Sequence, residues 1–362
     1  MSNESVVILD GARTPMGGLN GCLSPVSAPE LATTAIKAAV ERSGVEGADV
    51  DEVFMGCVLP ACLNQCPARQ TAIGAGIPKS TGAVTLNKAC GSGMQATIFG
   101  YDSIMAGTNK VVITGGMESM TNAPHLLLGA RGGVRTGHGQ MYDHMFLDGL
   151  EDAYTGRAMG TFAQETADER GLTREDMDTF AIESLTRAKN AIDSGALDAE
   201  TAPVTVVTRK GETVVKDDEQ PHKAALDRIP KLRPAFAKEG TITAANASSI
   251  SDGASALVLM SGSEAEQRGL SPMARIVGHA RHSQEPAEFT IAPIGAMEKL
   301  FASTGWSKDD VDLFEINEAF AMVTMLAMRD LGLDHDKVNV HGGACAQGHP
   351  ICYTGSRIIV SL

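Results

Sequence analysis

The chain has few aromatic residues and no long apolar run. Phe, Trp and Tyr make up 4% of its 362 residues, and tryptophan occurs once. Because no stretch of roughly 18 apolar residues occurs, we expect no membrane-spanning helix. Residues 1–15 contain no basic stretch followed by an apolar one, which argues against a secretory signal. We therefore expect a cytoplasmic protein that does not contact a membrane.

Basic residues are too few for a nucleic-acid surface. Lys and Arg total 30 against 44 Asp and Glu, and the formal net charge is −14. A broad phosphate-binding surface needs the opposite balance, so we expect no nucleic-acid partner. An anionic ligand would have to be held by a few local basic groups and by helix N-termini.

The seven cysteines are an odd number, spread along a chain without a recognisable secretory signal. That pattern favours free thiols in a reducing compartment over a disulfide framework. Cys57, Cys62 and Cys66 lie close together in the sequence, but no second pair of ligands accompanies them. We therefore predict no metal site.

Apolar residues and glycine dominate what the chain does contain. Hydrophobic residues make up 43% of it and glycine occurs 39 times, which is enough for one large domain or two to three ordinary ones. Short apolar runs alternate with helical spacing, as is typical of an α/β domain with helices on the sheet faces. We predict strands over 6–9, 50–58 and 110–115 and helices over 28–43 and 92–106. The last helix is almost wholly apolar and small, which predicts burial on all sides.

A second copy of this arrangement follows. The segment SGVEGADVDEVFMG at 43–56 parallels TGWSKDDVDLFEIN at 304–317, and the C-x-[ST]-G pattern at 90–93 parallels that at 352–355. Each copy reads as a helix, a strand and a second helix opened by that pattern. A duplicated domain is the economical explanation, and chance similarity of a short segment is the alternative.

The region between the copies differs in character. It is rich in glycine, charge and turns, with one amphipathic helix predicted over 174–194 and Thr173 as its N-cap. The apolar run at 251–261 then reads as a strand that returns to the first sheet. We therefore divide the chain into a first half made of 1–119 and 249–270, an inserted loop domain over 120–248, and a second half over 271–362.

Cys90 is the first residue that we single out for chemistry. It follows a short strand, lies in the glycine-flanked turn NKACGSG at 87–93 and precedes an apolar helix. The partial positive charge of a helix N-terminus favours thiolate over thiol, so we predict an ionised nucleophile. A buried structural cysteine is the alternative that the local sequence leaves open.

Two polar loops of the second half supply a candidate base and a candidate oxyanion donor. His349, in GGACAQGHP at 342–350, is a candidate general base or oxyanion donor, and Asn317, in EINEAFA at 315–321, is placed to orient a water. A solvated loop histidine and an ordinary N-cap asparagine are the alternatives. A nucleophile, a base and an oxyanion donor are the parts that acyl transfer requires.

Six segments, in order, resemble the signature blocks of the thiolase family. They are NKACGSGMQA at 87–96, GGMESM at 115–120, LRPAFAKEGTITAANAS at 232–248, DGASALVLMS at 252–261, INEAFA at 316–321 and GGACAQGHP at 342–350. The likeness covers nearly the whole chain and is greatest to the short-chain acetyl-CoA acetyltransferases. It implies an α/β fold of two duplicated βαβαβαββ halves, in five α-β-α-β-α layers, with an inserted loop domain for tetramerisation and CoA binding.

The resemblance also implies a role for each matching residue. Cys90 would take the acyl group, and His349 would activate it. With a water held by Asn317, His349 would also stabilise the thioester enolate. Six further positions fall where the family contacts the pantetheine arm or the acyl chain: Leu150, Met159, Phe236, Ser248, Phe289 and Phe320. The segment 132–153 resembles the loop through which such enzymes assemble, so we expect a homotetramer built from dimers.

The activity implied by the resemblance is a Claisen condensation or its thiolytic reversal. Two acetyl-CoA would be interconverted with acetoacetyl-CoA and CoA through an acyl-Cys90 intermediate. Because CoA is substrate and product, no separate cofactor is expected. The alternatives are a longer-chain 3-ketoacyl-CoA thiolase, a condensing ketosynthase that uses a carrier protein, and a catalytically impaired acyl-CoA-binding homologue.

The chain departs from the family in its second base. Family members end with a C-x-G-G-G-M-G turn whose cysteine takes the proton from the second acetyl group, and residues 1–362 contain no such motif. We therefore expect the sequence to be part of a longer protein. Cys352 stands where the family has glycine, either as a substitute base or, as we favour, as a packing residue. Glu118 reads equally well as a buried partner of the catalytic loops or as a helix-start carboxylate.

Overall fold

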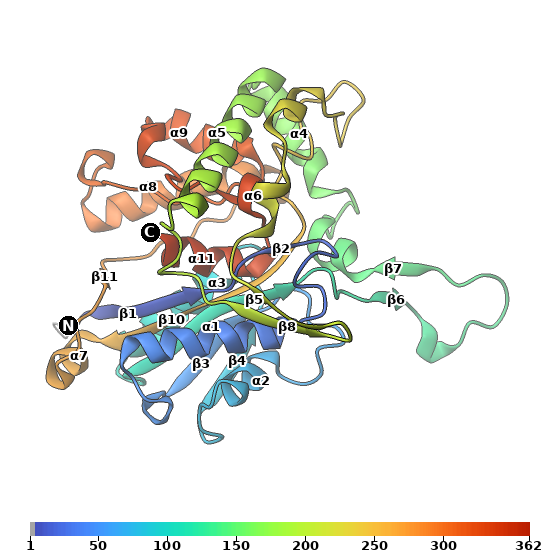
Figure 1. The fold of residues 1–362 in the computed structure, drawn as a ribbon. Helices are drawn as coiled ribbons and strands as arrows, with labels where there is room; N and C mark the ends of the chain where they lie inside the picture. Colours follow the sequence, from blue (N-terminus) through green and yellow to red (C-terminus); the bar gives the residue numbers. More distant parts are fainter. Residues whose placement is uncertain (1–3) are drawn as a thin grey trace.

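A mixed sheet of seven strands forms one layer of the molecule, whose computed structural model describes residues 4–362 (Figure 1). The strand order is β11-β1-β10-β5-β3-β4, and β2 pairs with β10. These strands span β1 Val6–Arg13, β2 Gly17–Gly18, β3 Glu52–Gly56, β4 Gly82–Leu86, β5 Val111–Ser119, β10 Ser251–Ser261 and β11 Ala274–Ile276.

Strands β5 and β10 form the centre of this sheet, and every residue of both is buried. They pair antiparallel in register from Asp252–Ser119 to Met260–Val111. Glycine permits the close approach, because a Cβ added at Gly115 would lie 2.1 Å from the Ser255 carbonyl oxygen. The strand predicted over 251–261 therefore completes the sheet between β1 and β5.

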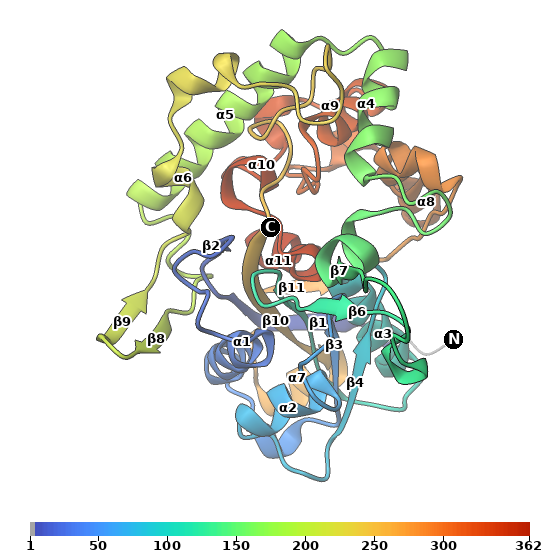
Figure 2. The same ribbon diagram turned by 90° about the vertical axis from the view of Figure 1, so that its right-hand side faces the viewer.

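Helices cover both faces of the sheet, as two views at right angles show (Figures 1 and 2). Helices α1 (Ala28–Ser43) and α2 (Pro67–Gly74) lie on one face, and α3 (Ser92–Met105) and α11 (Thr354–Ser361) lie on the other. The predicted all-round burial of α3 is wrong, since the Phe99 side chain is 42% exposed. Phe99 packs edge-on against Phe54 of β3, the strand next to the edge strand β4.

The turns of the two sequence copies have the same geometry. Helix α1 ends at Gly44 with φ 71°, and α8 (Ala292–Thr304) ends at Gly305 with φ 74°. A single 3-10 turn follows in each copy, and such left-handed helix ends favour glycine. The first copy continues into β3, whereas the second forms an isolated parallel bridge between Phe314 and Val338 among the described residues. Helix α9 (Ala321–Leu331) packs beside α8.

The inserted region contributes helices above the sheet and two exposed hairpins. Helix α5 (Arg174–Asp193) begins at the predicted N-cap, because the Thr173 hydroxyl accepts the Asp176 N–H. The other elements are α4 Met159–Glu169, α6 Glu219–Lys223, β6 His125–Leu127, β7 Met141–Asp143, β8 Val204–Thr208 and β9 Gly211–Val215; outside this region lie α7 Gly262–Arg268 and α10 Ala344–Gln347. The β6–β7 arm projects far from the rest of the molecule (Figure 1). Within residues 4–362, no helix has the length and apolar character needed to cross a bilayer.

Candidate active site

Cys90 lies in a tight turn between β4 and α3. The turn is held by Ser92, whose hydroxyl accepts the Lys88 N–H at 2.7 Å and donates to the Ala89 carbonyl at 2.6 Å. Ala89 has φ 46°, a left-handed conformation that is unusual for a residue with a Cβ. Backbone strain of this kind is concentrated at functional sites, where surrounding contacts hold it in place.

The structure brings Cys90 and His349 together, although 259 positions separate them in the sequence. The Cys90 Sγ lies 3.1 Å from His349 Nε2, within hydrogen-bonding distance for sulfur. The other ring nitrogen, Nδ1, lies 2.6 Å from Thr354 Oγ1, and the His349 N–H donates to the Ser249 carbonyl at 3.1 Å. His349 is buried, so the alternative of a solvated loop histidine is wrong.

Loss of solvation favours the neutral form of both groups of this pair. It raises the pKa of the Cys90 thiol to about 11. Burial and, to a lesser extent, the positive charge of Arg357 lower the pKa of His349 to about 4. The direction of this shift opposes the resting thiolate expected from the sequence, because loss of solvation favours the thiol, although Cys90 directly precedes Gly91, the N-cap of α3. The nucleophile has to be generated by proton transfer from Cys90 to His349.

Asn317 and Glu318 lie between the Phe314 bridge and α9. The N-cap of α9 is Phe320, so the alternative of Asn317 as its N-cap is wrong. Asn317 Oδ1 is buried and accepts no hydrogen bond from residues 4–362. Glu318 accepts hydrogen bonds from Asn339 Nδ2 at 2.8 Å, the Ser184 hydroxyl at 2.9 Å and the Cys345 N–H at 3.0 Å. This carboxylate therefore ties α5 and the loop before His349 to the segment that carries Asn317.

Glu118, near the end of β5, similarly connects two segments of the first half by hydrogen bonds. It is fully buried and accepts the N–H groups of Val58 at 3.1 Å and Leu59 at 2.9 Å. Burial raises the pKa of its carboxyl. The helix-start interpretation is wrong, because Glu118 lies in β5; the carboxyl is a buried hydrogen-bond partner, but of the loop at Val58 and Leu59.

Cys352 is a packing residue in the described structure. Its side chain is fully buried, and its thiol donates to the Met117 carbonyl at 2.9 Å. Burial raises its thiol pKa well above the ordinary value, and the nearby Glu118 carboxylate adds to that effect. A thiol that is neutral and already hydrogen-bonded is a poor base, so the substitute-base interpretation is not supported.

Three predicted substrate-binding aromatics gather into one cluster. The rings of Phe236 and Phe289 lie edge-on to Phe320 at centroid distances of 6.2 and 6.3 Å. Ser248 belongs to the same place, since its hydroxyl and N–H both donate to the Ala319 carbonyl. The sequence predicted these four positions through the resemblance, and the fold brings them to one wall.

The two remaining predicted positions lie at the edges of this site. Leu150 packs against the apolar cluster that Cys90 also adjoins, formed by Val58, Leu59, Met120, Met145, Ile351 and Cys352. Met159 begins α4, and the next residue, Gly160, faces Phe236, because a Cβ there would lie 2.1 Å from the ring. The sequence analysis did not single out Thr354, although Thr354 is the serine-or-threonine position of the second C-x-[ST]-G pattern.

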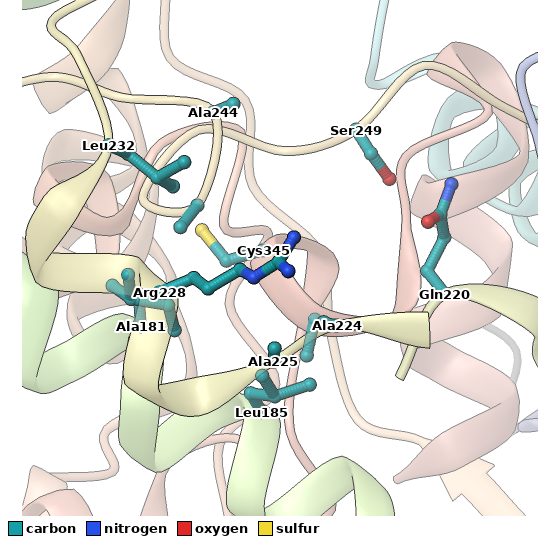
Figure 3. Close-up of a pocket in the computed structure, with 13 residues that line it drawn as sticks. Ala181, Leu185, Gln220, Ala224, Ala225, Arg228, Leu232, Ala244, Ser249 and Cys345 are labelled. Atoms are coloured by element: carbon teal, nitrogen blue, oxygen red, sulfur yellow. The ribbon is translucent and has the colours of Figure 1, made fainter. Parts of the chain in front are cut away.

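A cavity of about 240 Å³ lies beside the catalytic pair, between α5, α6 and α10 (Figure 3). Its walls are mostly alanine and leucine side chains, and Arg228 extends across it. Neither Cys90 nor His349 lines it, but Ser249 does, and the Ser249 carbonyl holds the His349 N–H. Within residues 4–362, no group of three His, Cys, Asp or Glu side chains is arranged to hold a metal ion.

Comparison with known proteins assigns both halves of the chain. Residues 6–263 match the thiolase N-terminal domain and residues 270–362 match the thiolase C-terminal domain. The chain belongs to the thiolase family. The sequence resemblance to that family is therefore confirmed.

Individual thiolases are similar over almost the whole chain. A probable acetyl-CoA acetyltransferase of Dictyostelium discoideum is 46% identical over 99% of this chain and 87% of its own length. An acetyl-CoA acetyltransferase of Rhizobium meliloti is 47% identical over 100% of this chain and 92% of its own length. The crystal structure of Acat5 thiolase from Ascaris suum in complex with coenzyme A superposes with a TM-score of 0.95 at 40% identity, over 99% of this chain and 92% of that one. The predicted thiolase-like α/β fold is confirmed.

Proposed function

We propose that this thiolase-family chain is an acetyl-CoA C-acetyltransferase that works through an acyl-Cys90 intermediate. It interconverts two acetyl-CoA with acetoacetyl-CoA and CoA. The observation that carries the proposal is the 3.1 Å approach of the partly buried Cys90 Sγ to Nε2 of the buried His349. Similarity to proteins named acetyl-CoA acetyltransferases supports the substrate class.

The first half-reaction transfers the acyl group to Cys90. As the Cys90 sulfur attacks the thioester carbonyl, His349 Nε2 accepts the thiol proton. The tetrahedral intermediate then expels the CoA thiolate, which takes that proton from the imidazolium and leaves as CoA thiol. Since burial lowers the pKa of His349 to about 4, its imidazolium is more acidic than an ordinary one, which favours return of the proton.

The second half-reaction forms the carbon–carbon bond. A second acetyl-CoA loses an α-proton to a base, and its enolate attacks the acyl-Cys90 carbonyl and displaces the cysteine thiolate. The thiolate then takes up one proton, so that the half-reaction ends with acetoacetyl-CoA and the Cys90 thiol. We assign a water bound to Asn317 to the enolate oxygen, because Asn317 Oδ1 is a buried acceptor that no side chain among residues 4–362 occupies. We assign no group among the described residues to the α-proton.

A short acyl chain suits the aromatic cluster. Phe289 and Phe236 both pack edge-on against Phe320, and the three rings take up space beside the proposed acyl site. We place the pantetheine arm along Ser248 and Phe320 and the acyl group against Phe289, with Leu150 and Met159 closing the site. Arg228, in the adjacent cavity, offers a cation for a phosphate of CoA.

We further propose a homotetramer built from dimers. Strand β4 is at the edge of the sheet, and its unpaired backbone groups can pair with a second copy. The β6–β7 arm carries exposed apolar residues, with Met141 69% and Leu127 48% exposed, and such a surface suits protein contact. The seven free thiols suit the reducing cytoplasm. CoA is both substrate and product of the proposed reaction, which calls for no other cofactor.

Intact-protein mass spectrometry after mixing with acetyl-CoA tests the first half-reaction. We expect one acetyl adduct, mapped to Cys90, and no adduct in Cys90→Ser. Thiolysis of acetoacetyl-CoA by CoA, followed by loss of its ultraviolet absorbance, tests the second. An unmodified parent protein under conditions in which it is folded would overturn the proposal and favour a homologue that only binds acyl-CoA.

A further inference from the structure

Thr354 lies against the ring nitrogen of His349 that does not face Cys90. A neutral imidazole can accept the Cys90 proton at Nε2 only when its hydrogen is on Nδ1. Nδ1 lies 2.6 Å from Thr354 Oγ1, and Thr354 is 1% exposed, so water does not compete for this bond. When the hydroxyl oxygen accepts the Nδ1 hydrogen, the Nε2 lone pair is left facing Cys90.

A hydroxyl at this place differs chemically from a carboxylate. A carboxylate partner would stabilise the imidazolium and raise the pKa of the histidine, as in serine hydrolases. Thr354 is neutral, and the nearby guanidinium of Arg357 disfavours the imidazolium further. The arrangement therefore suits a histidine that takes a proton from Cys90 and releases it to the departing thiolate within one half-reaction.

Arg357 lies one helical turn after Thr354 in α11 and is 1% exposed. Its Nη1 donates to Glu315 Oε2 at 3.0 Å, and both side chains of this ion pair are buried. Glu315 precedes Asn317 by two residues. The ion pair therefore joins the helix that holds His349 to the segment that carries Asn317.

We propose that Thr354 and the Arg357–Glu315 pair are positioning residues for the acyl transfer at Cys90. The Thr354 hydroxyl fixes the tautomer and orientation of His349, and the ion pair fixes the distance between His349 and Asn317. This inference rests on the proposed function. It gives a task in the reaction to three buried polar side chains that do not touch the substrate.

Rapid-quench measurement of acyl-Cys90 formation from acetyl-CoA tests the role of Thr354. Thr354→Val keeps the shape but removes the acceptor, and we expect the acylation rate to fall about 100-fold. We expect the KM for acetyl-CoA to change by less than about threefold, because Thr354 does not line the substrate site. Thr354→Ser retains the acceptor and should acylate within about fivefold of the parent. Acylation of Thr354→Val at the parent rate, or an equal loss in Thr354→Ser, would overturn the assignment.

The ion pair is tested by Glu315→Gln against a matched control. Asp218→Asn breaks the buried pair with Arg13, whose atoms lie 2.8 Å apart and whose side chains are 1% exposed. We expect both variants to lower the melting temperature, and only Glu315→Gln to lower kcat, by about tenfold. Equal effects on kcat would reduce the Arg357–Glu315 pair to a structural role.

The acylation assay also separates this inference from the proposed function. If the parent protein forms no acetyl adduct, the proposed function is wrong. If the parent is acylated and Thr354→Val is acylated at the same rate, only the inference about Thr354 is wrong.

Discussion

Gly93 and Gly355 occupy equivalent places in the two sequence copies and face each other's helices. A Cβ at Gly93 would lie 2.7 Å from the Cys352 carbonyl, and a Cβ at Gly355 would lie 2.7 Å from the Met94 nitrogen and 3.2 Å from the Cys90 carbonyl. Helices α3 and α11 therefore pack with their first turns in contact. The contact sets the catalytic turn of one copy against the His349 loop of the other.

Substitution of Gly355 by alanine should disturb this contact. We expect Gly355→Ala to lower the free energy of unfolding by about 1–3 kcal/mol, because backbone atoms must move to admit the methyl group. We expect a slower acyl transfer as well, since the Cys90 carbonyl is one of the crowded atoms. Gly132→Ala is the control, because a Cβ there meets nothing within 4 Å and its φ is not positive. Equal melting temperatures for the two variants would contradict the packing argument.

The depressed pKa of His349 predicts a loss of stability in acid. Its folded-state pKa of about 4 lies below the ordinary value of 6.5, so the unfolded chain binds the proton first as pH falls. Between pH 6.5 and 4 this group alone should remove roughly 3 kcal/mol of unfolding free energy. Denaturant titrations of the parent and His349→Gln across that range measure the difference. A His349→Gln variant with the parent's pH dependence would show that His349 is not the group responsible.

Phe289 should limit the length of the acyl chain. Phe289→Ala removes the ring that packs 6.3 Å from Phe320 and opens space beside the proposed acyl site. We expect kcat/KM for a six-carbon 3-ketoacyl-CoA, relative to acetoacetyl-CoA, to rise about tenfold, the range that a few methylene contacts provide. Phe99→Ala, at an exposed ring on the outer side of α3, should leave this ratio unchanged. An unchanged ratio in Phe289→Ala would place the acyl chain elsewhere.

Cys352 should be dispensable for chemistry. Because its thiol is buried and bonded to the Met117 carbonyl, Cys352→Ala should form acyl-Cys90 at the parent rate. We expect a loss of about 1 kcal/mol of unfolding free energy from the vacated volume and the lost hydrogen bond. Acylation and thermal melting measured on the same sample separate the two effects. A large fall in acylation with unchanged melting would restore Cys352 as a candidate proton acceptor.

The local sequence determined most of the secondary structure around the site. The helix predicted over 28–43 has those bounds in the structure, and Thr173 caps α5 as predicted. The repeated Gly44 and Gly305 turns revealed the duplication because only glycine readily adopts their left-handed backbone. The sequence blocks also predicted that Cys90 and His349 belong to one site. Periodicity, capping and glycine conformation are local properties, so they can be read from neighbouring residues.

The tertiary structure alone decided the ionisation of the site and the partners of its buried polar groups. A helix N-terminus suggested a thiolate at Cys90, but burial by distant segments raises its pKa to about 11. The contacts of Thr354 with His349, of Glu118 with Val58 and Leu59, and of Arg357 with Glu315 join segments that the sequence does not relate. The solvation of a group and the charges near it depend on every element packed around it. Neighbouring residues in the sequence therefore do not determine them.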